Sequence, residues 1–252
     1  MVVTMNIVEI KNLNYSYKDK EIFENLNINI KKNTITTILG SNGSGKSTLA
    51  RLINKKYRNI KINTTKINYV YSNPDEQIVG NTVKEQLMFY LKQTNIDNTI
   101  INNKIKKIIR EFKLAEVIDN DPYQLNNEQK QLIVLLSNTL IHPELLILDD
   151  ALSFVGTYYK NKVLRYLKRQ KISIINFTND TEECMYSNYI VIINKKVVLN
   201  KTLKKALKEE KIFIENNLKL PFIAELSLKL NYYKLLDDTV LNIEEMVNKL
   251  WN

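Results

Sequence analysis

The sequence predicts an α/β fold in which helices cover a largely parallel sheet, and two patterns support this prediction. In the second half of the chain, short apolar runs alternate with amphipathic segments, an order typical of parallel sheets with helices on their faces. In addition, three of the five glycines in the 252 residues, Gly40, Gly43 and Gly45, follow directly on a run of β-branched and apolar residues. Glycine this concentrated indicates one backbone site that needs its conformational freedom.

The first 71 residues contain several segments with the pattern of strands. Residues 7–13 and 26–30 alternate between apolar and polar side chains with a period of two, as half-buried strands do. Residues 34–39 are β-branched or apolar throughout, which is typical of a strand buried on both faces. We expect a helix over about 46–54 and a further strand over 66–71.

The middle of the chain is predicted to be helical, from about residue 77 to 119 and again from 127 to 140. Apolar residues between Ile100 and Phe112 repeat at spacings of three and four. Strands are then expected at 145–148, 173–177, 189–193 and 196–199, with a helix over 158–170, followed by short tail helices at 223–230 and 243–250. We therefore expect one domain over residues 1–200, with a helical subdomain at about 77–140, and a helical extension over 201–252.

Composition excludes several classes of protein. Hydrophobic residues make up 44% of the chain and charged residues 25%, which argues against intrinsic disorder. No stretch approaches 18 uninterrupted apolar residues, so we expect no membrane span. We also expect no signal peptide, and the single cysteine, Cys184, excludes a disulfide framework. The net charge of +10 fits either an anionic partner or a lysine-rich solvated surface.

The glycine cluster lies within a segment that satisfies the pattern G-x-x-x-x-G-K-[ST]. Between a buried strand and a helix, such a loop surrounds phosphate groups with backbone N–H groups. Lys46 would reach the β- and γ-phosphates, and Ser47 would hold Mg²⁺. The predicted phosphate-binding residues are Gly40, Ser41, Asn42, Gly43, Ser44, Gly45, Lys46, Ser47 and Thr48.

A second motif is the apolar strand that ends in the two carboxylates Asp149 and Asp150. At the carboxyl edge of a parallel sheet beside a phosphate loop, Asp149 can help to coordinate Mg²⁺. Apolar strands often end in Asp, so this motif gains its meaning from the phosphate loop about 100 residues before it.

The order of these motifs resembles that of the ATP-binding cassette (ABC) ATPases, over about residues 7–199. The resemblance implies a P-loop nucleoside-triphosphatase fold of ABC type, with an N-terminal β-subdomain, a helical subdomain and a small C-terminal helical tail. It implies ATP and Mg²⁺ as cofactors. It also implies that Tyr17 is the aromatic residue that stacks on adenine.

Within this family, residues 71–83 and two parts of the tail, 220–222 and 241–245, resemble the ATPases of energy-coupling factor (ECF) transporters, which power vitamin and metal-ion uptake. The resemblance implies a second ABC ATPase subunit, a transmembrane coupling protein docked near residues 72–82, and a substrate-binding membrane protein as partners. It implies a location on the cytoplasmic face of the membrane and no nucleic-acid partner.

The family signature LSGGQ is altered in this chain. The segment reads Leu125, Asn126, Asn127, Glu128 and Gln129, so both glycines are missing. In the family, this segment caps the γ-phosphate bound to the opposite subunit. A carboxylate at Glu128 would repel a polyphosphate, whereas Asn126 or Asn127 as N-cap with Glu128 in the first turn makes a sound helix start. Both interpretations can hold together.

Three catalytic positions also depart from the family pattern. Asp150 stands at the catalytic glutamate and is one methylene shorter. Asn179 stands at the switch histidine and cannot become cationic. Ser72 replaces a glutamine and is too short to reach Mg²⁺ in the same way. Gly156 stands where the family has an aspartate that acts across the dimer, and the only histidine, His142, is expected in a loop.

These departures predict that the chain binds nucleotide but hydrolyses it poorly at its own phosphate loop. We therefore expect a heterodimer in which the partner supplies an intact signature, glutamate and histidine. Two alternatives remain open at this stage. The chain could be a non-transport ABC protein that acts on nucleic acid, or a catalytically silent ATP-binding subunit.

Overall fold

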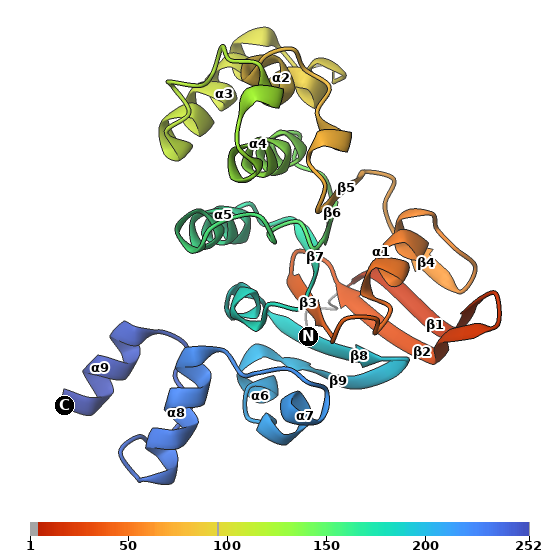
Figure 1. The fold of residues 1–252 in the computed structure, drawn as a ribbon, viewed down its shortest axis with the longest axis vertical. Helices are drawn as coiled ribbons and strands as arrows, with labels where there is room; N and C mark the ends of the chain where they lie inside the picture. The colour runs from red at the N-terminus through yellow and green to blue at the C-terminus, as the bar shows by residue number, and fades with distance from the viewer. Residues whose placement is uncertain (1–4, 95, 252) are drawn as a thin grey trace. The chain divides into compact units, whose positions relative to one another are not determined.

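The computed structural model describes residues 5–94 and 96–251, which form two compact units (Figure 1). The first unit consists of the chain up to Asn63 together with the chain from Ser173 onward. The second consists of Thr64–Ile172. Both units mix strands and helices, which confirms the predicted α/β class.

An antiparallel sheet in the first unit contains the N-terminal strands. Its strand order is β2-β1-β4. The strands are β1 (Asn6–Tyr17), β2 (Lys20–Lys31) and β4 (Ile60–Ile62). The predicted strands at 7–13 and 26–30 are confirmed as parts of β1 and β2. Strand β4 was not expected, because three residues are too few to show an alternating pattern.

A second group of strands in the first unit is parallel around β3. Strand β3 pairs in parallel with β7 on one side and β8 on the other, and β9 pairs antiparallel with β8. These elements are β3 (Ile35–Leu39), β7 (Ser173–Thr178), β8 (Tyr189–Asn194) and β9 (Lys196–Thr202), with helix α1 (Lys46–Asn54) after β3. All five residues of β3 are buried, as its sequence predicts. Since Leu39 pairs with Thr178, the carboxyl ends of β3 and β7 lie side by side.

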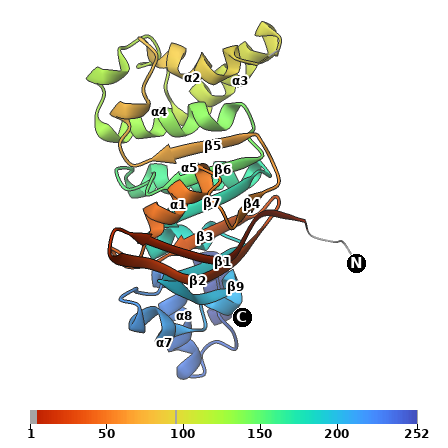
Figure 2. The same cartoon turned by 90° about the vertical axis from the view of Figure 1, so that its right-hand side faces the viewer.

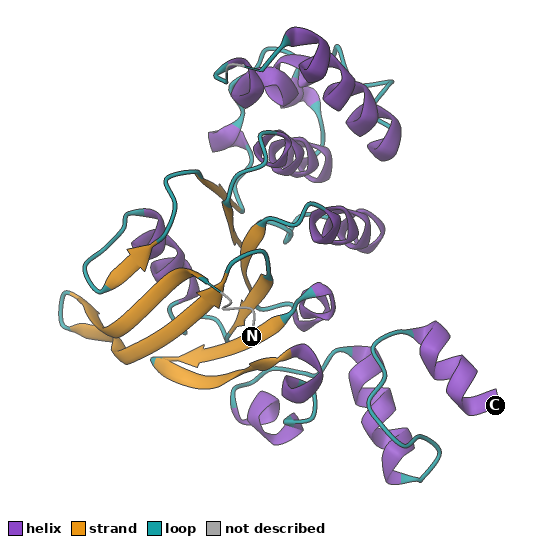
Figure 3. Ribbon diagram, turned by 180° about the vertical axis from the view of Figure 1, so that it is seen from behind, coloured by secondary structure: helices purple, strands orange, loops and turns teal. Residues whose placement is uncertain are grey.

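The C-terminal tail consists of short helices that follow β9 (Figure 3). They are α6 (Leu203–Ala206), α7 (Glu210–Glu215), α8 (Phe222–Tyr232) and α9 (Ile243–Trp251). Phe213 and Leu207 share a hydrophobic core with Ile190 and Ile192 of β8. The predicted helices at 223–230 and 243–250 are confirmed as α8 and α9, which have a small core of their own around Val240 and Met246.

The second unit pairs two parallel strands and contains the longer helices (Figure 2). Helix α4 lies along the strand pair, and α2 and α3 pack beyond it. The elements are β5 (Ile67–Tyr71), α2 (Val83–Lys92), α3 (Asn98–Phe112), α4 (Asn127–Leu140), β6 (Leu145–Asp149) and α5 (Thr157–Arg169). Every residue of α4 from Lys130 to Leu140 is buried, which explains the continuous apolar run over residues 132–136.

Short 3₁₀ turns complete both units, at Asp75–Gln77, Pro122–Gln124 and Thr181–Tyr186. None of the helices among the described residues is long and apolar enough to cross a membrane.

Candidate nucleotide-binding site

The loop between β3 and α1 has the backbone shape of an anion-binding loop. Gly43 and Gly45 have φ values of +81° and +98°, a region that L-residues with a Cβ rarely adopt. Gly45 is the N-cap of α1, and neither a side-chain cap nor an acidic residue occupies the first turn of that helix. The helix dipole at this turn favours an anionic ligand.

At two positions the loop is packed so tightly that the glycine cannot gain a side chain. A Cβ on Gly40 would lie 2.3 Å from Ser44 Oγ and 2.7 Å from the carbonyl oxygen of Ile193. A Cβ on Gly45 would lie 2.7 Å from the ring of Phe23 on β2. The buried Ser44 Oγ has no hydrogen-bond partner among the described residues, so it can serve a ligand.

Lys46 folds back over this loop. Its Nζ donates to the carbonyl oxygens of Gly40 at 2.6 Å and Ser41 at 3.1 Å. The ammonium group is therefore held within the loop that would receive the phosphates. Ser47 and Thr48 follow in the first turn of α1.

The switch position lies beside the phosphate loop. Asn179 follows β7, and its Nδ2 donates to Oδ1 of Asn42 at 3.1 Å. The parallel pairing of β3 with β7 brings these two segments together. An amide at this position can donate a hydrogen bond toward a phosphate but carries no charge.

Tyr17 lies at the end of the β1–β2 hairpin, where it pairs with Lys20. Its side chain is 66% exposed, so the face of the ring is available for stacking. The same hairpin reaches the phosphate loop, because Phe23 and Ile22 lie against Gly45. The structure therefore places Tyr17 on the strand pair that packs against the loop.

In the second unit, Asp149 is the buried last residue of β6. Tyr69 of β5 donates its hydroxyl hydrogen to Asp149 Oδ2 at 2.6 Å. Sequence reasoning missed Tyr69, since nothing in the alternation of β5 distinguishes its hydroxyl from that of Tyr71. The pairing register of β5 with β6 is what identifies Tyr69 as a partner of Asp149. Tyr69 pairs with Ile147, so it lies diagonally across from Asp149 on the same face.

Asp150 begins the turn after β6 with φ of +54°. Aspartate tolerates this left-handed conformation better than most residues, because its short polar side chain can bond locally. Its carbonyl oxygen accepts a hydrogen bond from the N–H of Ser153, which closes the turn.

The altered signature forms a regular helix start. Asn126 is the N-cap of α4, and its Oδ1 accepts from the N–H of Gln129 at 2.9 Å, while Gln129 Oε1 accepts from the N–H of Asn126 at 3.3 Å. This reciprocal pair is a capping box and confirms the helix-start interpretation of Asn126 with Glu128 in the first turn. Glu128 Oε1 also accepts the N–H of Gly156 at 2.8 Å. Leu125 precedes the cap and is partly buried.

Ser72 lies in a segment, residues 71–82, that amide side chains hold in place. Gln77 is buried and bonds the backbone at Tyr71 and Asn73, through three hydrogen bonds of 2.8–3.2 Å. Gln86 of α2 accepts from the N–H groups of Val79 at 2.8 Å and Gly80 at 3.1 Å.

The same segment is tied to α4 and to the 3₁₀ turn that precedes α4. Lys130 donates to Asp75 at 2.8 Å, and the Tyr123 hydroxyl donates to the carbonyl oxygen of Ile78 at 3.2 Å. The side chain of Lys130 is only 11% exposed. Sequence reasoning missed Gln77, Gln86 and Lys130, whose importance lies in tertiary contacts.

The oxygen donors fit a hard divalent cation. The hydroxyl of Ser47 and the carboxylate of Asp149 are ligand types that Mg²⁺ accepts, with substrate phosphates completing the set. Each of these side chains stands at the position in its own unit that the sequence predicts: Ser47 at the start of α1 and Asp149 at the end of β6.

A glycine loop between a buried parallel strand and an uncapped helix N-terminus, with a lysine folded into the loop, defines a phosphate-loop nucleotide-binding protein. Residues 23–153 match the model of the ABC transporter family. The chain therefore belongs to the ABC transporter family, within the group of energy-coupling factor ATP-binding proteins, and is a transport ATPase.

The relatives cover nearly the whole chain. The energy-coupling factor transporter ATP-binding protein EcfA1 of Leuconostoc mesenteroides is 30% identical, over 89% of this chain and 91% of that protein. EcfA of Aster yellows witches'-broom phytoplasma is 30% identical, over 92% of this chain and 91% of that protein. The solved structure of cbiO1 from Clostridium perfringens, part of the ABC transporter complex cbiONQ, is 23% identical with a TM-score of 0.70. The matched region covers 88% of this chain and 98% of the cbiO1 chain, and the similarity supports the assignment of the fold.

Proposed function

We propose that this chain is the ATP-binding subunit of an ECF-type importer and that it binds ATP with Mg²⁺ at the loop of residues 40–48. The observation that carries this proposal is the shape of the loop, with two glycines at positive φ and Lys46 held at its carbonyl oxygens. Ser47 and Asp149 would hold the cation, which neutralises charge on the β- and γ-phosphates. The exposed ring of Tyr17 would stack on the base.

Hydrolysis at this loop is expected to be weak, so the working assembly is a heterodimer with a second ABC ATPase. The chain offers a short carboxylate at Asp150 and an uncharged amide at Asn179. A general base must lie within hydrogen-bonding distance of the attacking water, and the shorter side chain of Asp150 reaches less far than a glutamate. Ser72 provides only a short hydroxyl where a longer amide would reach the cation. The partner would supply an intact signature, glutamate and histidine, and turnover would occur mainly at the partner's loop.

Residues 72–82 would receive a transmembrane coupling protein, on the cytoplasmic face of the membrane. Val79 is 54% exposed at the centre of this segment, while Gln77 and Gln86 fix its backbone. The ion pair between Lys130 and Asp75 joins the segment to α4, whose N-terminus carries the signature residues. A displacement of α4 would therefore reach the docked protein. A substrate-binding membrane protein would select the solute, a vitamin or a metal ion.

Equilibrium dialysis of the purified chain with MgATP tests the nucleotide site. We expect binding that Lys46→Met abolishes and Asp150→Asn leaves unchanged, because Asp150 is assigned to chemistry and not to affinity. Failure of the unaltered, folded chain to bind ATP would refute the assignment of the loop.

Steady-state hydrolysis by the heterodimer tests the division of labour. The partner in this assay would be a second ABC ATPase subunit that assembles with this chain. Mutation of the partner's catalytic glutamate should abolish turnover, whereas Asp150→Asn in this chain should change it little. If the isolated chain hydrolyses ATP at normal transporter rates and Asp150→Asn abolishes that activity, the asymmetric scheme is wrong. If turnover survives loss of the partner's glutamate, the scheme is wrong as well.

A further inference from the structure

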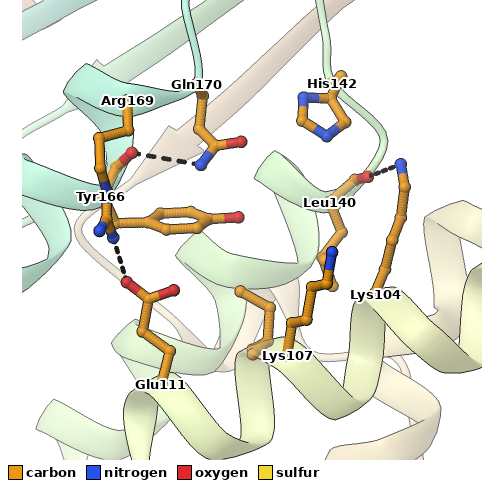
Figure 4. Close-up of a pocket in the computed structure, with 9 residues that line it drawn as sticks. Lys104, Lys107, Glu111, Leu140, His142, Tyr166, Arg169 and Gln170 are labelled. Atoms are coloured by element: carbon orange, nitrogen blue, oxygen red, sulfur yellow. Dashed lines mark hydrogen bonds and ion pairs between the residues drawn. The ribbon is translucent and has the colours of Figure 1, made fainter.

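A cavity of about 320 Å³ opens within the second unit, apart from the residues assigned to nucleotide (Figure 4). It lies between α3, α5 and the loop that follows α4. Ligand pockets for small molecules begin at about this size. None of the motifs that define the ATPase lines it, so it is a separate site.

The charged residues of this cavity are mainly cationic. Lys104, Lys107 and Arg169 line it together with a single carboxylate, Glu111. Arg169 pairs with Glu111 and so neutralises it. Lys104 donates to the carbonyl oxygen of Leu140 at 3.0 Å, and neither Lys104 nor Lys107 has a carboxylate partner in the part of the chain that the structure describes. Two ammonium charges therefore remain uncompensated at the cavity.

Neutral polar groups complete its lining. The ring of His142 and the phenol of Tyr166 both point into the space in Figure 4. The side chain of Tyr166 is buried against α3 by an edge-to-face contact with Phe112, which fixes the direction of its hydroxyl. The Gln170 amide is held by the carbonyl oxygen of Tyr166 at 3.3 Å, at the cavity wall. His142 therefore adds hydrogen-bonding capacity to the two ammonium groups, whereas the hydroxyl of Tyr166 is already hydrogen-bonded to Thr139.

The surroundings of the cavity disfavour positive charge on the residues that line it. Desolvation lowers the pKa of Lys104, and desolvation together with the charge of Lys104 lowers the pKa of His142. Both effects mean that the cavity disfavours a further positive charge. An anionic ligand would relieve that repulsion.

We propose that this cavity binds a small phosphate-bearing molecule, whose phosphate group accepts from Lys104, Lys107 and His142 and whose remainder lies against Ile108 and Leu140. A phosphate is favoured over a single carboxylate because it carries close to two negative charges on one small group, which the two ammonium groups can share as point charges. The guanidinium of Arg169, which could bind either anion through paired hydrogen bonds, is already paired with Glu111. The bound molecule would join α3 to α5 and stabilise the second unit.

Calorimetric titration of the full chain at constant ionic strength tests the site. The probes are inorganic phosphate and glycerol 3-phosphate, and the protein carries Lys46→Met so that the nucleotide loop contributes no binding. We expect both probes to bind. Lys107→Gln should weaken the affinity for each probe at least about tenfold, because it removes a charge-assisted hydrogen bond. His142→Asn, which keeps a residue tolerant of the positive φ at that position, should also weaken them.

Lys168→Gln is the matched control, because Lys168 is exposed on α5 beside Arg169 and does not line the cavity. It removes the same charge and should leave both affinities nearly unchanged. Three results would overturn the proposal. These are no binding of either probe to the folded Lys46→Met protein, equal weakening by Lys168→Gln and Lys107→Gln, or malonate binding at least as tightly as phosphate. Because ATP binding is measured separately in the unaltered chain, failure here leaves the ATPase assignment standing.

Discussion

The two glycines at positive φ in the phosphate loop should respond very differently to the same substitution. At Gly45, with φ of +98°, a Cβ would lie 2.7 and 2.8 Å from two ring carbons of Phe23 and 3.0 Å from Ile22. Phe23 is fully buried, so its ring cannot move aside without disturbing the core of the first unit. At Gly43, with φ of +81°, a Cβ would meet nothing within 4 Å.

The expected magnitudes follow from these two surroundings. A left-handed backbone costs an L-residue about 1–2 kcal/mol, a penalty that applies to both positions. Overpacking adds about 1–3 kcal/mol at Gly45 alone. We therefore expect Gly45→Ala to lower the free energy of unfolding by about 2–5 kcal/mol and Gly43→Ala by about 1–2 kcal/mol.

Urea unfolding of both variants, followed by circular dichroism, measures this difference. Phe23→Leu in the Gly45→Ala background should recover part of the loss, because a smaller side chain makes room for the Cβ. MgATP affinity should fall in Gly45→Ala, since the first turn of α1 must shift. Equal destabilisation by the two substitutions would refute the close approach of β2 to the loop.

Three further predictions test other contacts. Asn126→Ala removes the cap of α4 and should cost about 1 kcal/mol in urea unfolding; no loss would contradict the capping box. Tyr69→Phe removes the donor to the buried Asp149 and should cost about 1.5–3 kcal/mol, with a neutral result counting against that hydrogen bond. The pKa of His142 should lie below 6.5 in an NMR titration and rise in Lys104→Gln. With a lowered pKa, the folded chain binds fewer protons than the unfolded chain, so the free energy of unfolding should decrease as the pH falls below about 6.5. His142→Asn should remove this pH dependence. If the dependence persists in that variant, it does not come from His142.

The sequence is sufficient to predict those parts of the fold that rest on local pattern. The apolar run of β3 and the glycines after it predict the phosphate loop, because buried parallel strands and positive φ each restrict the residues allowed. The three- and four-residue spacing between Ile100 and Phe112 predicts α3, because that spacing places the apolar side chains on one face of a helix. Strand β4 has no such pattern, and it exists because Val8 to Ile10 of β1 offers it a partner.

The candidate site is predictable only where a motif specifies backbone shape. Tertiary contacts decide the rest. Tyr69 meets Asp149 because β5 and β6 pair in one particular register, and a shift by one residue would turn its hydroxyl to the other face. Lys130 looks like an ordinary helix residue in the sequence, yet its burial against Asp75 makes it a link between α4 and residues 71–82.

The altered signature illustrates this difference most clearly. From the sequence, Glu128 and Gly156 are two separate departures from a family pattern. In the structure they contact each other, since the Glu128 carboxylate accepts the N–H of Gly156 at 2.8 Å. A Cβ at position 156 would lie 2.9 Å from Glu128 Oε1, so any larger residue there would require the glutamate to move. Glycine at 156 and a carboxylate at 128 are therefore one local arrangement, in which the start of α4 holds the turn before α5.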